Sequence, residues 1–401
     1  MRPISRRAAL GAGLAALVVP RIALANAPTD KRFVFVILRG GLDALSAVPP
    51  YFDPGYRASR GNLGPFEPDA KEGAALDLDG RFGLHPALEP LAAMFQAGEL
   101  GIVHAVATPY RERSHFDAQD LLENGTLRAH STPDGWLNRA LGLMGKAPDR
   151  RLGLAVGQTV PFVLRGANPV GSWTPQTMPE LNPDFLALLA QVYRGDRNFE
   201  PALAEGLRSQ AMNDEVLGDE KMAPEGARGL RGPAAIRTAA SAVGKLLAAS
   251  DGPRLAAMDI GGWDTHAQQN QRLATMLRAL GEGLAALREA TGPAWRQTGV
   301  LVATEFGRTA SVNGSGGTDH GTAGAAFVLG GAVQGGRVLG RWPGLASQQL
   351  WQGRDLAPTT DLRAVAKAVL VGHLGLPADG VDRVVFPDSG DIRPFEALVR
   401  V

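Results

Sequence analysis

The chain has 401 residues, 45% of them hydrophobic and 20% charged, which is typical of a globular protein with a large core. Its formal net charge of +1 excludes a nucleic-acid-binding protein by bulk charge, and the absence of cysteine excludes disulfides and thiolate metal sites. Any metal ion must therefore be held by histidine, carboxylate and hydroxyl groups, which favours zinc, manganese, magnesium or calcium.

The first 25 residues have the features of an export signal. Three arginines lie among the first seven residues, an apolar run covers 8–19, and Ala23-Leu24-Ala25 is a small-residue cleavage site. The apolar run is shorter than the roughly 20 residues of a membrane-spanning helix. Ser5-Arg6-Arg7-x-x-Leu10 resembles the twin-arginine consensus, whose route carries folded proteins, and an ordinary secretory signal is the alternative.

We therefore expect the twin-arginine translocase as a partner during export, and a periplasmic or secreted location. Removal of residues 1–25 takes away four arginines and no acid, which leaves 37 basic against 40 acidic residues. The sequence contains no second long hydrophobic stretch, so we expect no stable membrane insertion and no nucleic-acid partner.

The rest of the chain alternates between short apolar runs and longer amphipathic segments. In chain order we expect a strand at 33–38, a helix at 85–97, a strand at 101–106, helices at 114–123 and 136–144, short strands at 151–156 and 161–165, a helix at 234–249, a strand at 255–260, a long helix to about residue 290, strands at 299–304 and 325–329, and a helix at 361–375. This order predicts an α/β fold with a mostly parallel sheet and helices on both faces.

One segment breaks this alternation. Residues 196–232 are rich in charge, glycine and proline and show no apolar period. We expect an exposed insertion around one amphipathic helix there. The remainder of 26–401 is expected to be a single domain.

Polar residues follow the predicted strands, where an open parallel α/β sheet places its active site. The candidates are Asp43 after the first strand, Ser114 and His115 after the second, Asp264 and His266 after the strand at 255–260, Glu305 after the strand at 299–304, and Asp319 and His320 before the strand at 325–329. The chain has only seven histidines, so the gathering of three of them here predicts a metal site.

Each group also has a purely structural interpretation. Ser114-x-x-Asp117 and Thr265-x-x-Gln268 both match the capping box that begins a helix, and Asp264 would suit the same capping role. Asp43 suits a turn, and Asp319-His320 suits a plain loop.

Three arginines, Arg39, Arg113 and Arg308, flank the same clusters. They would bind an anionic group with forked geometry, or be ordinary surface arginines.

Six sequence blocks together resemble a known family. They are Arg-Gly-Gly-Leu-Asp (39–43), Leu-His-Pro-Ala-Leu (84–88), Arg-Ser-His-Phe-Asp-Ala-Gln-Asp (113–120), Gly-Gly-Trp-Asp-Thr-His (261–266), Thr-Glu-Phe-Gly-Arg-Thr (304–309) and Gly-Thr-Asp-His-Gly (317–321). In this order they resemble the exported family catalogued as domain of unknown function 1501, over nearly all of the mature chain. That family is similar to the alkaline phosphatase and sulfatase superfamily, whose members act on phosphate and sulfate esters at one or two metals.

The resemblance implies an alkaline-phosphatase-like sandwich and a role for each block. Asp43 matches the metal aspartate after the first strand, Ser114 matches the nucleophile at a helix start, and Asp264 and His266 match an aspartate and histidine on one metal. Asp319-His320 matches either a late Asp-His-Gly motif or a later single histidine. We favour the second match, which puts Glu305 in the place of the aspartate.

These observations predict an exported, metal-dependent hydrolase of phosphate or sulfate esters, acting on a small molecule or a polymer. Ser114 would attack in line to form a covalent intermediate, His115 would protonate the leaving group, and Arg39 or Arg113 would hold the equatorial oxygens. The alternatives are a non-catalytic binding or assembly protein that keeps the superfamily fold, and a metal-dependent enzyme for another ester in which water attacks and Ser114 only caps a helix.

Overall fold

The computed structural model describes residues 29–71, 73–145, 152–157, 159–174, 182–197, 199–217 and 232–400, with the side chains of 205, 208, 209 and 211–214 excepted. The export signal expected over residues 1–25 lies outside these ranges. So does the part of the expected insertion at 218–231.

Within the described ranges, nine strands form one sheet in the order β10-β4-β9-β8-β1-β7-β5-β6, with β11 also paired to β4. They are β1 (Arg32–Arg39), β4 (Leu100–Ala107), β5 (Gly153–Val156), β6 (Gly171–Trp173), β7 (Leu255–Gly261), β8 (Thr298–Thr304), β9 (Gly324–Leu329), β10 (Arg337–Leu339) and β11 (Thr360–Asp361). A separate small hairpin joins β2 (Leu76–Asp77) to β3 (Gly83–Leu84).

The sheet is mostly parallel, as the alternation predicted. Every strand pair is parallel except the two pairs that β9 makes with β8 and β4. The central strand β1 is buried from Arg32 to Leu38, which explains why its sequence is apolar without alternation.

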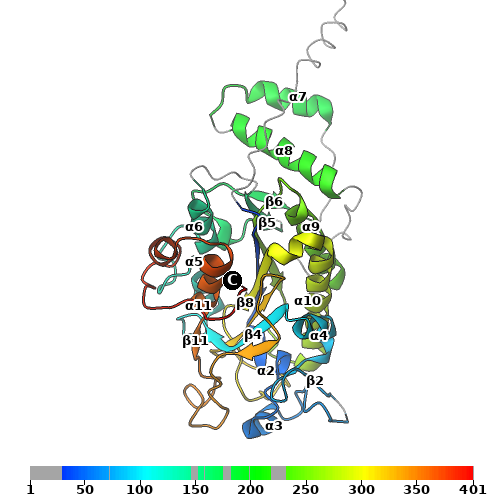
Figure 1. Cartoon of the computed structure of the whole chain (residues 1–401), viewed down its shortest axis with the longest axis vertical. Coiled ribbons are helices and arrows are strands. Elements are labelled where there is room, and N and C mark those ends of the chain that lie inside the picture. Colours follow the sequence, from blue (N-terminus) through cyan, green and yellow to red (C-terminus); the bar gives the residue numbers. More distant parts are fainter. Residues whose placement is uncertain are drawn as a thin grey trace, which may run out of the picture.

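Helices cover both faces of this sheet (Figure 1). One face carries η1 (Pro86–Leu88), α4 (Glu89–Gln96), α9 (Pro233–Ala248) and α10 (Gln269–Thr291), and the other carries α5 (His115–Asn124), α6 (Trp136–Leu143), α11 (Leu362–Lys367) and η5 (Ala368–His373). The fold is therefore the α/β class expected from the sequence.

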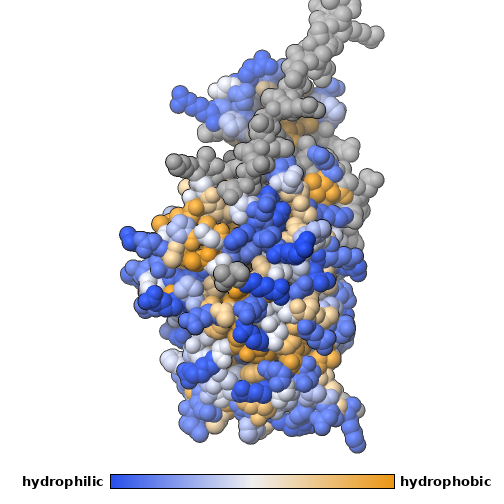
Figure 2. Space-filling view, in the orientation of Figure 1, coloured by the Kyte–Doolittle hydropathy of each residue, from blue (hydrophilic) through white to orange (hydrophobic). Residues whose placement is uncertain are grey.

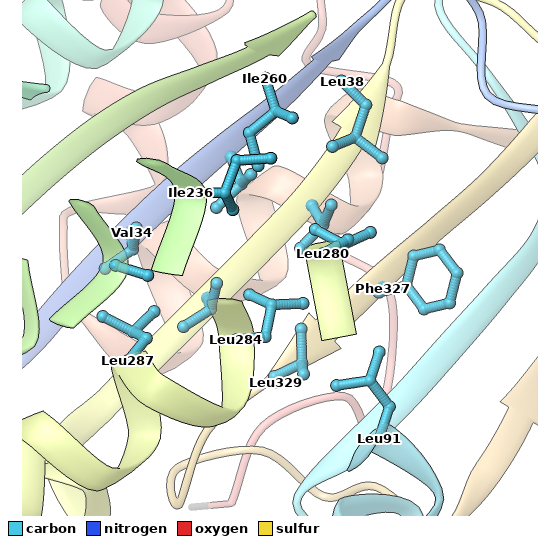
Figure 3. Packing of buried hydrophobic residues seen from close by; sticks show 14 of the residues in the cluster. Val34, Leu38, Leu91, Ile236, Ile260, Leu280, Leu284, Leu287, Phe327 and Leu329 are labelled. Atoms are coloured by element: carbon cyan, nitrogen blue, oxygen red, sulfur yellow. The ribbon is translucent and has the colours of Figure 1, made fainter. Parts of the chain in front are cut away.

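Alternate residues of each strand supply the two cores. Figure 3 shows Val34 and Leu38 of β1 among leucines of α10 and beside Ile236 of α9. On the other face, the ring of Phe35 lies 5.1 Å from the ring of Trp136 on α6, centroid to centroid. Both cores fix the central strands, and through them the loops at the strand ends.

Eight further helices complete the described part of the chain. They are α2 (Ala44–Ala47), α3 (Pro54–Arg60), η3 (Phe162–Leu164), α7 (Pro183–Val192), α8 (Phe199–Leu217), η4 (Gly292–Gln297), α12 (Ala378–Gly380) and η6 (Val381–Val385). Figure 1 shows α7 and α8 beyond the β5–β6 side of the molecule, outside the two helix layers, and no residue of α7 is buried. Helix α8 occupies the first part of the expected insertion.

No helix in the described part of the chain is long and apolar enough to cross a membrane. Figure 2 shows hydrophilic and hydrophobic residues interspersed over the face in view.

One local prediction is wrong. The expected strand at 161–165 is the short helix η3, because Pro161 has a φ of −61° and its carbonyl accepts a hydrogen bond from the Leu164 amide at 3.0 Å. The adjacent edge strand is β6 instead. The helix after β7 begins at Gln269, after the loop that carries Asp264 and His266, as expected.

Candidate metal centre

The candidate site lies where the loops after β1, β4, β7 and β8 meet. These four strands run in one direction, so their carboxyl ends share an edge of the sheet. Strand β9 runs in the opposite direction, so the loop that precedes it reaches the same edge. Asp319 and His320, which come before β9, therefore meet Asp264 and His266, which come after β7.

Asp264 is at the centre of this cluster. Its Oδ1 lies 3.0 Å from Nε2 of His266 and 3.2 Å from Nε2 of His320, and the two Nε2 atoms lie 3.0 Å apart. Its Oδ2 lies 3.6 Å from Nε2 of His115. The ligand atoms of His115, Asp264 and His320 thus form one close group, and Nε2 of His266 lies beside those of Asp264 and His320.

The other ring nitrogen of each histidine is held by an acceptor. His115 Nδ1 lies 2.8 Å from Oε1 of Glu305, and His266 Nδ1 lies 3.1 Å from Oδ1 of Asp319. His320 Nδ1 lies 3.1 Å from the backbone carbonyl of Arg113. Metal-binding histidines nearly always donate their second ring N–H to a carboxylate or a carbonyl in this way.

These acceptors are unprotonated carboxylates or a carbonyl. Burial raises the pKa of Glu305, but hydrogen bonds from His115 and Gln119 overcome this and bring it below its ordinary value. The hydrogen bond from Asn313, together with that from His266, likewise lowers the pKa of Asp319. Each Nδ1 can therefore donate to its acceptor, and Nε2 of each ring faces Asp264. The hydrogen bond to Glu305 raises the pKa of His115.

Asp264 is itself charged. Burial raises its pKa, but the hydrogen bond and charge of Arg308 overcome this and the pKa lies below its ordinary value. Three histidine nitrogens then lie close to this carboxylate, and Arg308 is its strong donor. Nε2 of His115 is buried and has no hydrogen-bond partner. A divalent cation fits between His115, Asp264 and His320, whose ligand atoms all lie within 4.8 Å of one another.

The structure brings together four of the residues expected to form a metal site or to act in catalysis: His115, Asp264, His266 and His320. Asp319 and Glu305 are present in a different capacity, since each holds a histidine. Glu305 is buried, and its Oε1 also accepts hydrogen bonds from the Gly40 amide at 2.8 Å and from Gln119 at 3.0 Å. That leaves Glu305 little capacity to bind a metal directly.

Asp43 does not contribute an oxygen to this cluster. Its side chain is buried, forms an ion pair with Arg60, and accepts hydrogen bonds from Gln269 and from the Ser46 hydroxyl at 3.0 Å. It also caps α2 through the amide of Leu45. These contacts match the turn interpretation of Asp43.

The three arginines are not ordinary surface arginines, and all have protein partners. Arg39 pairs with Asp259 and Glu123, each at 2.8 Å. Arg308 is buried and donates to Asp264 at 2.6 Å. Because their guanidinium groups are paired with protein carboxylates, neither Arg39 nor Arg308 matches the role of holding substrate oxygens.

Arg113 also has a protein partner, since its Nε donates to Asp355 at 2.8 Å. It reaches the cluster through its backbone carbonyl, on His320.

Ser114 occupies the N-cap position of α5, but its side chain makes no capping hydrogen bond. The capping box predicted at Thr265 is not formed either, because α10 begins at Gln269 and the Thr265 hydroxyl donates to the side chain of Gln269 at 2.9 Å. The structural interpretations of these two motifs are therefore wrong. Ser114 lies half-buried, directly before His115.

Sequence reasoning missed the residues that hold the cluster in place. Gln119 lies one helical turn after His115, and that i, i+4 spacing is a signal that would have placed it beside His115. Asn313, Asp355, Arg60 and Gln269 come from distant segments, and no spacing in the sequence points to them.

Comparisons with known proteins agree with the resemblance of the sequence blocks. A family model described as "Protein of unknown function (DUF1501)" matches residues 99–385. No curated protein matches the chain.

Several solved structures are similar to this one at low identity. The structure of BT1596, a 2-O GAG sulfatase, is 12% identical over 92% of this chain and 75% of that chain, with a TM-score of 0.39. The C-terminal periplasmic domain of EcEptC from Escherichia coli, in complex with Zn, is 12% identical over 93% and 94%, with a TM-score of 0.37. The alkaline phosphatase from the Antarctic bacterium TAB5 is 12% identical over 75% and 91%, with a TM-score of 0.34.

Proposed function

Because the chain belongs to the family of proteins of unknown function DUF1501, we propose a function from its own site: it is a metal-dependent hydrolase of phosphate or sulfate esters. His115, Asp264, His266 and His320 would hold one divalent metal ion, and Ser114 would be the nucleophile.

One observation carries this proposal. Three histidines from different segments each have Nδ1 fixed by an acceptor and Nε2 turned toward one carboxylate. In this group Nε2 of His115 is buried and has no hydrogen-bond partner, and an unpaired buried polar atom is costly. Here a cation would complete the group.

The donor set narrows the metal. Magnesium and calcium prefer ligand shells of oxygen alone, whereas imidazole nitrogen suits zinc and other first-row transition metals. Of the four metals expected from the sequence, three imidazoles and one carboxylate favour zinc, with manganese second.

The bound metal would act as a Lewis acid toward the ester and lower the pKa of the attacking hydroxyl. Ser114 would attack phosphorus or sulfur, forming a bond from Oγ and breaking the bond to the alcohol, which leaves with a proton. Water would then hydrolyse the seryl ester. The first backbone amides of α5, which Ser114 does not cap, would hold the anionic oxygens of the substrate.

Two roles expected from the sequence change in this proposal. His115 becomes a metal ligand instead of a proton donor, because Glu305 holds its Nδ1 and only Nε2 is free. The α5 amides replace Arg39 and Arg113 as the group that binds substrate oxygens, because both guanidinium groups have carboxylate partners.

Metal analysis of the natively purified protein is the first test. We expect about one zinc per chain, lost on dialysis against a chelator and regained from zinc salt. The control is His130→Ala, which removes an exposed histidine outside the cluster and should keep the metal. A protein without metal, whose melting temperature does not change on chelation, would instead favour the non-catalytic binding or assembly protein.

Ester hydrolysis is the second test. The metal-loaded protein is screened with p-nitrophenyl phosphate, bis-p-nitrophenyl phosphate and p-nitrophenyl sulfate. Ser114→Ala should retain the metal and lose turnover by at least 100-fold. If Ser114→Ala keeps full turnover, the nucleophile is water and Ser114 has no covalent role.

We also propose that the protein is exported by the twin-arginine route, on the strength of Ser5-Arg6-Arg7-x-x-Leu10. Replacement of both arginines by lysine should leave the protein in the cytoplasm with its signal attached, as seen by fractionation and intact mass. Unchanged export of this variant would favour the ordinary secretory signal.

A further inference from the structure

Arg113, which precedes Ser114 and His115 of the candidate site, has an unusual backbone conformation. Its φ is +62°, in the left-handed region that a residue with a long side chain rarely adopts. It lies between β4 and α5, directly before Ser114 and His115. Strained backbone at such a position persists only where surrounding contacts enforce it.

The enforcing contacts come from one short loop, residues 351–355, which we call the clamp loop. Arg113 Nε donates to Asp355 at 2.8 Å, and its Nη2 donates to Gln352 at 2.6 Å. The Asp355 side chain is fully buried, so this ion pair is well shielded from solvent.

The clamp loop holds the His320 segment as well. Arg354 donates to the backbone carbonyl of His320 at 2.9 Å, and the Thr322 hydroxyl donates to Asp355 at 2.8 Å. Both partners of the hydrogen bond between His320 Nδ1 and the Arg113 carbonyl are therefore attached to the same short loop.

We propose that Arg113 is a positioning residue for the metal ligand His320 and that it acts through its main chain. The left-handed φ aims the carbonyl of Arg113 at His320 Nδ1, fixes the ring as the Nδ1–H tautomer, and keeps Nε2 toward Asp264. The guanidinium, paired with Asp355, holds the backbone in this conformation and touches no substrate. This inference rests on the proposed metal site.

A matched pair of variants isolates the backbone. Arg113→Gly/Asp355→Asn and Arg113→Ala/Asp355→Asn both remove the guanidinium and the buried charge, and they differ only by a methyl group at residue 113. Glycine adopts φ near +60° freely and alanine does not. The alanine variant should bind zinc at least tenfold more weakly than the glycine variant, measured by competition with a chromophoric chelator.

A second pair of variants tests the same inference if the alanine variant does not fold. Arg113→Asn/Asp355→Asn places a residue that tolerates the left-handed region at the same position, and its zinc affinity should lie within about threefold of that of the glycine variant. Arg113→Gln/Asp355→Asn then replaces the alanine variant and should bind at least tenfold more weakly.

A second measurement distinguishes the positioning of His320 from a general effect of backbone strain on stability. The thermal midpoints of the metal-free proteins report strain alone, whereas the visible spectrum of bound cobalt reports the number of ligands. If the two variants of the pair bind zinc equally and differ only in metal-free stability, the inference is wrong while the metal site stands. If the wild-type protein binds no zinc, the proposed function fails and this inference fails with it.

Discussion

Two polar clusters lie beyond the carboxyl ends of the central strands, and each contains an aspartate that follows a strand. Asp43 is surrounded by donors only: Arg60, Gln269, the Ser46 hydroxyl and backbone amides. Asp264 has one strong donor, Arg308, and faces the Nε2 atoms of three histidines.

The different partners of Asp43 and Asp264 show how a purely structural hydrogen-bond network can be distinguished from a candidate metal site. Both aspartates match a motif, and position in the fold does not distinguish them. The balance of donors and acceptors does, because a group with surplus acceptors needs a cation from outside the chain. The predictions below test whether that balance separates stability from metal binding.

The largest effect is expected at Asp43. Asp43→Asn should lower the free energy of unfolding of the metal-free protein by about 3–5 kcal/mol, because it leaves the buried Arg60 without a counter-charge. Zinc affinity should change less than about threefold. Urea denaturation and chelator competition measure the two quantities. Loss of zinc with unchanged stability would instead make Asp43 a metal ligand, as the family resemblance implied.

His266 should give the opposite result. His266→Ala should weaken zinc binding at least about 100-fold, since it removes a ligand, and should change metal-free stability by no more than about 0.5 kcal/mol, since the side chain is 44% exposed. The control is again His130→Ala. Equal zinc affinity of the two variants would remove His266 from the site.

Asp319 tests the carboxylates that hold the histidines. Asp319→Ala should weaken zinc binding by about tenfold, because His266 Nδ1 loses its acceptor. Asp319→Asn keeps an oxygen at that position and should weaken binding less. If the asparagine variant binds as weakly as the alanine variant, Asp319 acts by its charge on the metal and not by orienting His266.

The smallest effect is expected at His104, which belongs to neither of the two clusters. His104 is buried, and its two ring nitrogens meet the Val48 carbonyl and the Ala105 amide, each at 3.0 Å. Burial lowers its pKa to about 4. The folded protein then binds fewer protons than the unfolded chain below pH 6.5, so stability falls as the pH drops from 6.5 toward 4.

The lowered pKa of His104 reduces the free energy of unfolding by about 1.4 kcal/mol at pH 5.5. Between pH 7.5 and 5.5, the metal-free wild type should lose about that much more stability than His104→Gln, measured by urea denaturation at each pH. Equal losses would mean that His104 is protonated in the folded state.

Most of the fold could be predicted from the sequence because it follows from local pattern. Apolar runs such as 33–38 and 255–260 became strands of the buried sheet, and the helices between them followed from periodicity. The run at 161–165 could not be assigned, since a short apolar segment suits a strand or a helix turn equally and Pro161 decided the outcome.

The members of the site could be predicted better than their roles. Histidine is scarce in the chain, so His115, His266 and His320 stood out. The roles of Arg39, Glu305 and Asp43 depend on partners such as Glu123, Gln119 and Arg60. Those partners are ordinary residues in the sequence, and only the folded chain shows that they reach these side chains.

The reversed direction of β9 has a consequence for the order of folding. The connection from β8 to β9 begins and ends at the edge of the sheet that carries the candidate site. Within 16 residues of chain it supplies Glu305, Arg308, Asp319 and His320. Such a short loop costs little entropy to close. The pairing of β1 with β8 joins residues 266 positions apart, as in the contact of Thr304 with Leu38, and must form more slowly. Half of the site can therefore assemble as a local hairpin before the long-range sheet brings Asp264 to it.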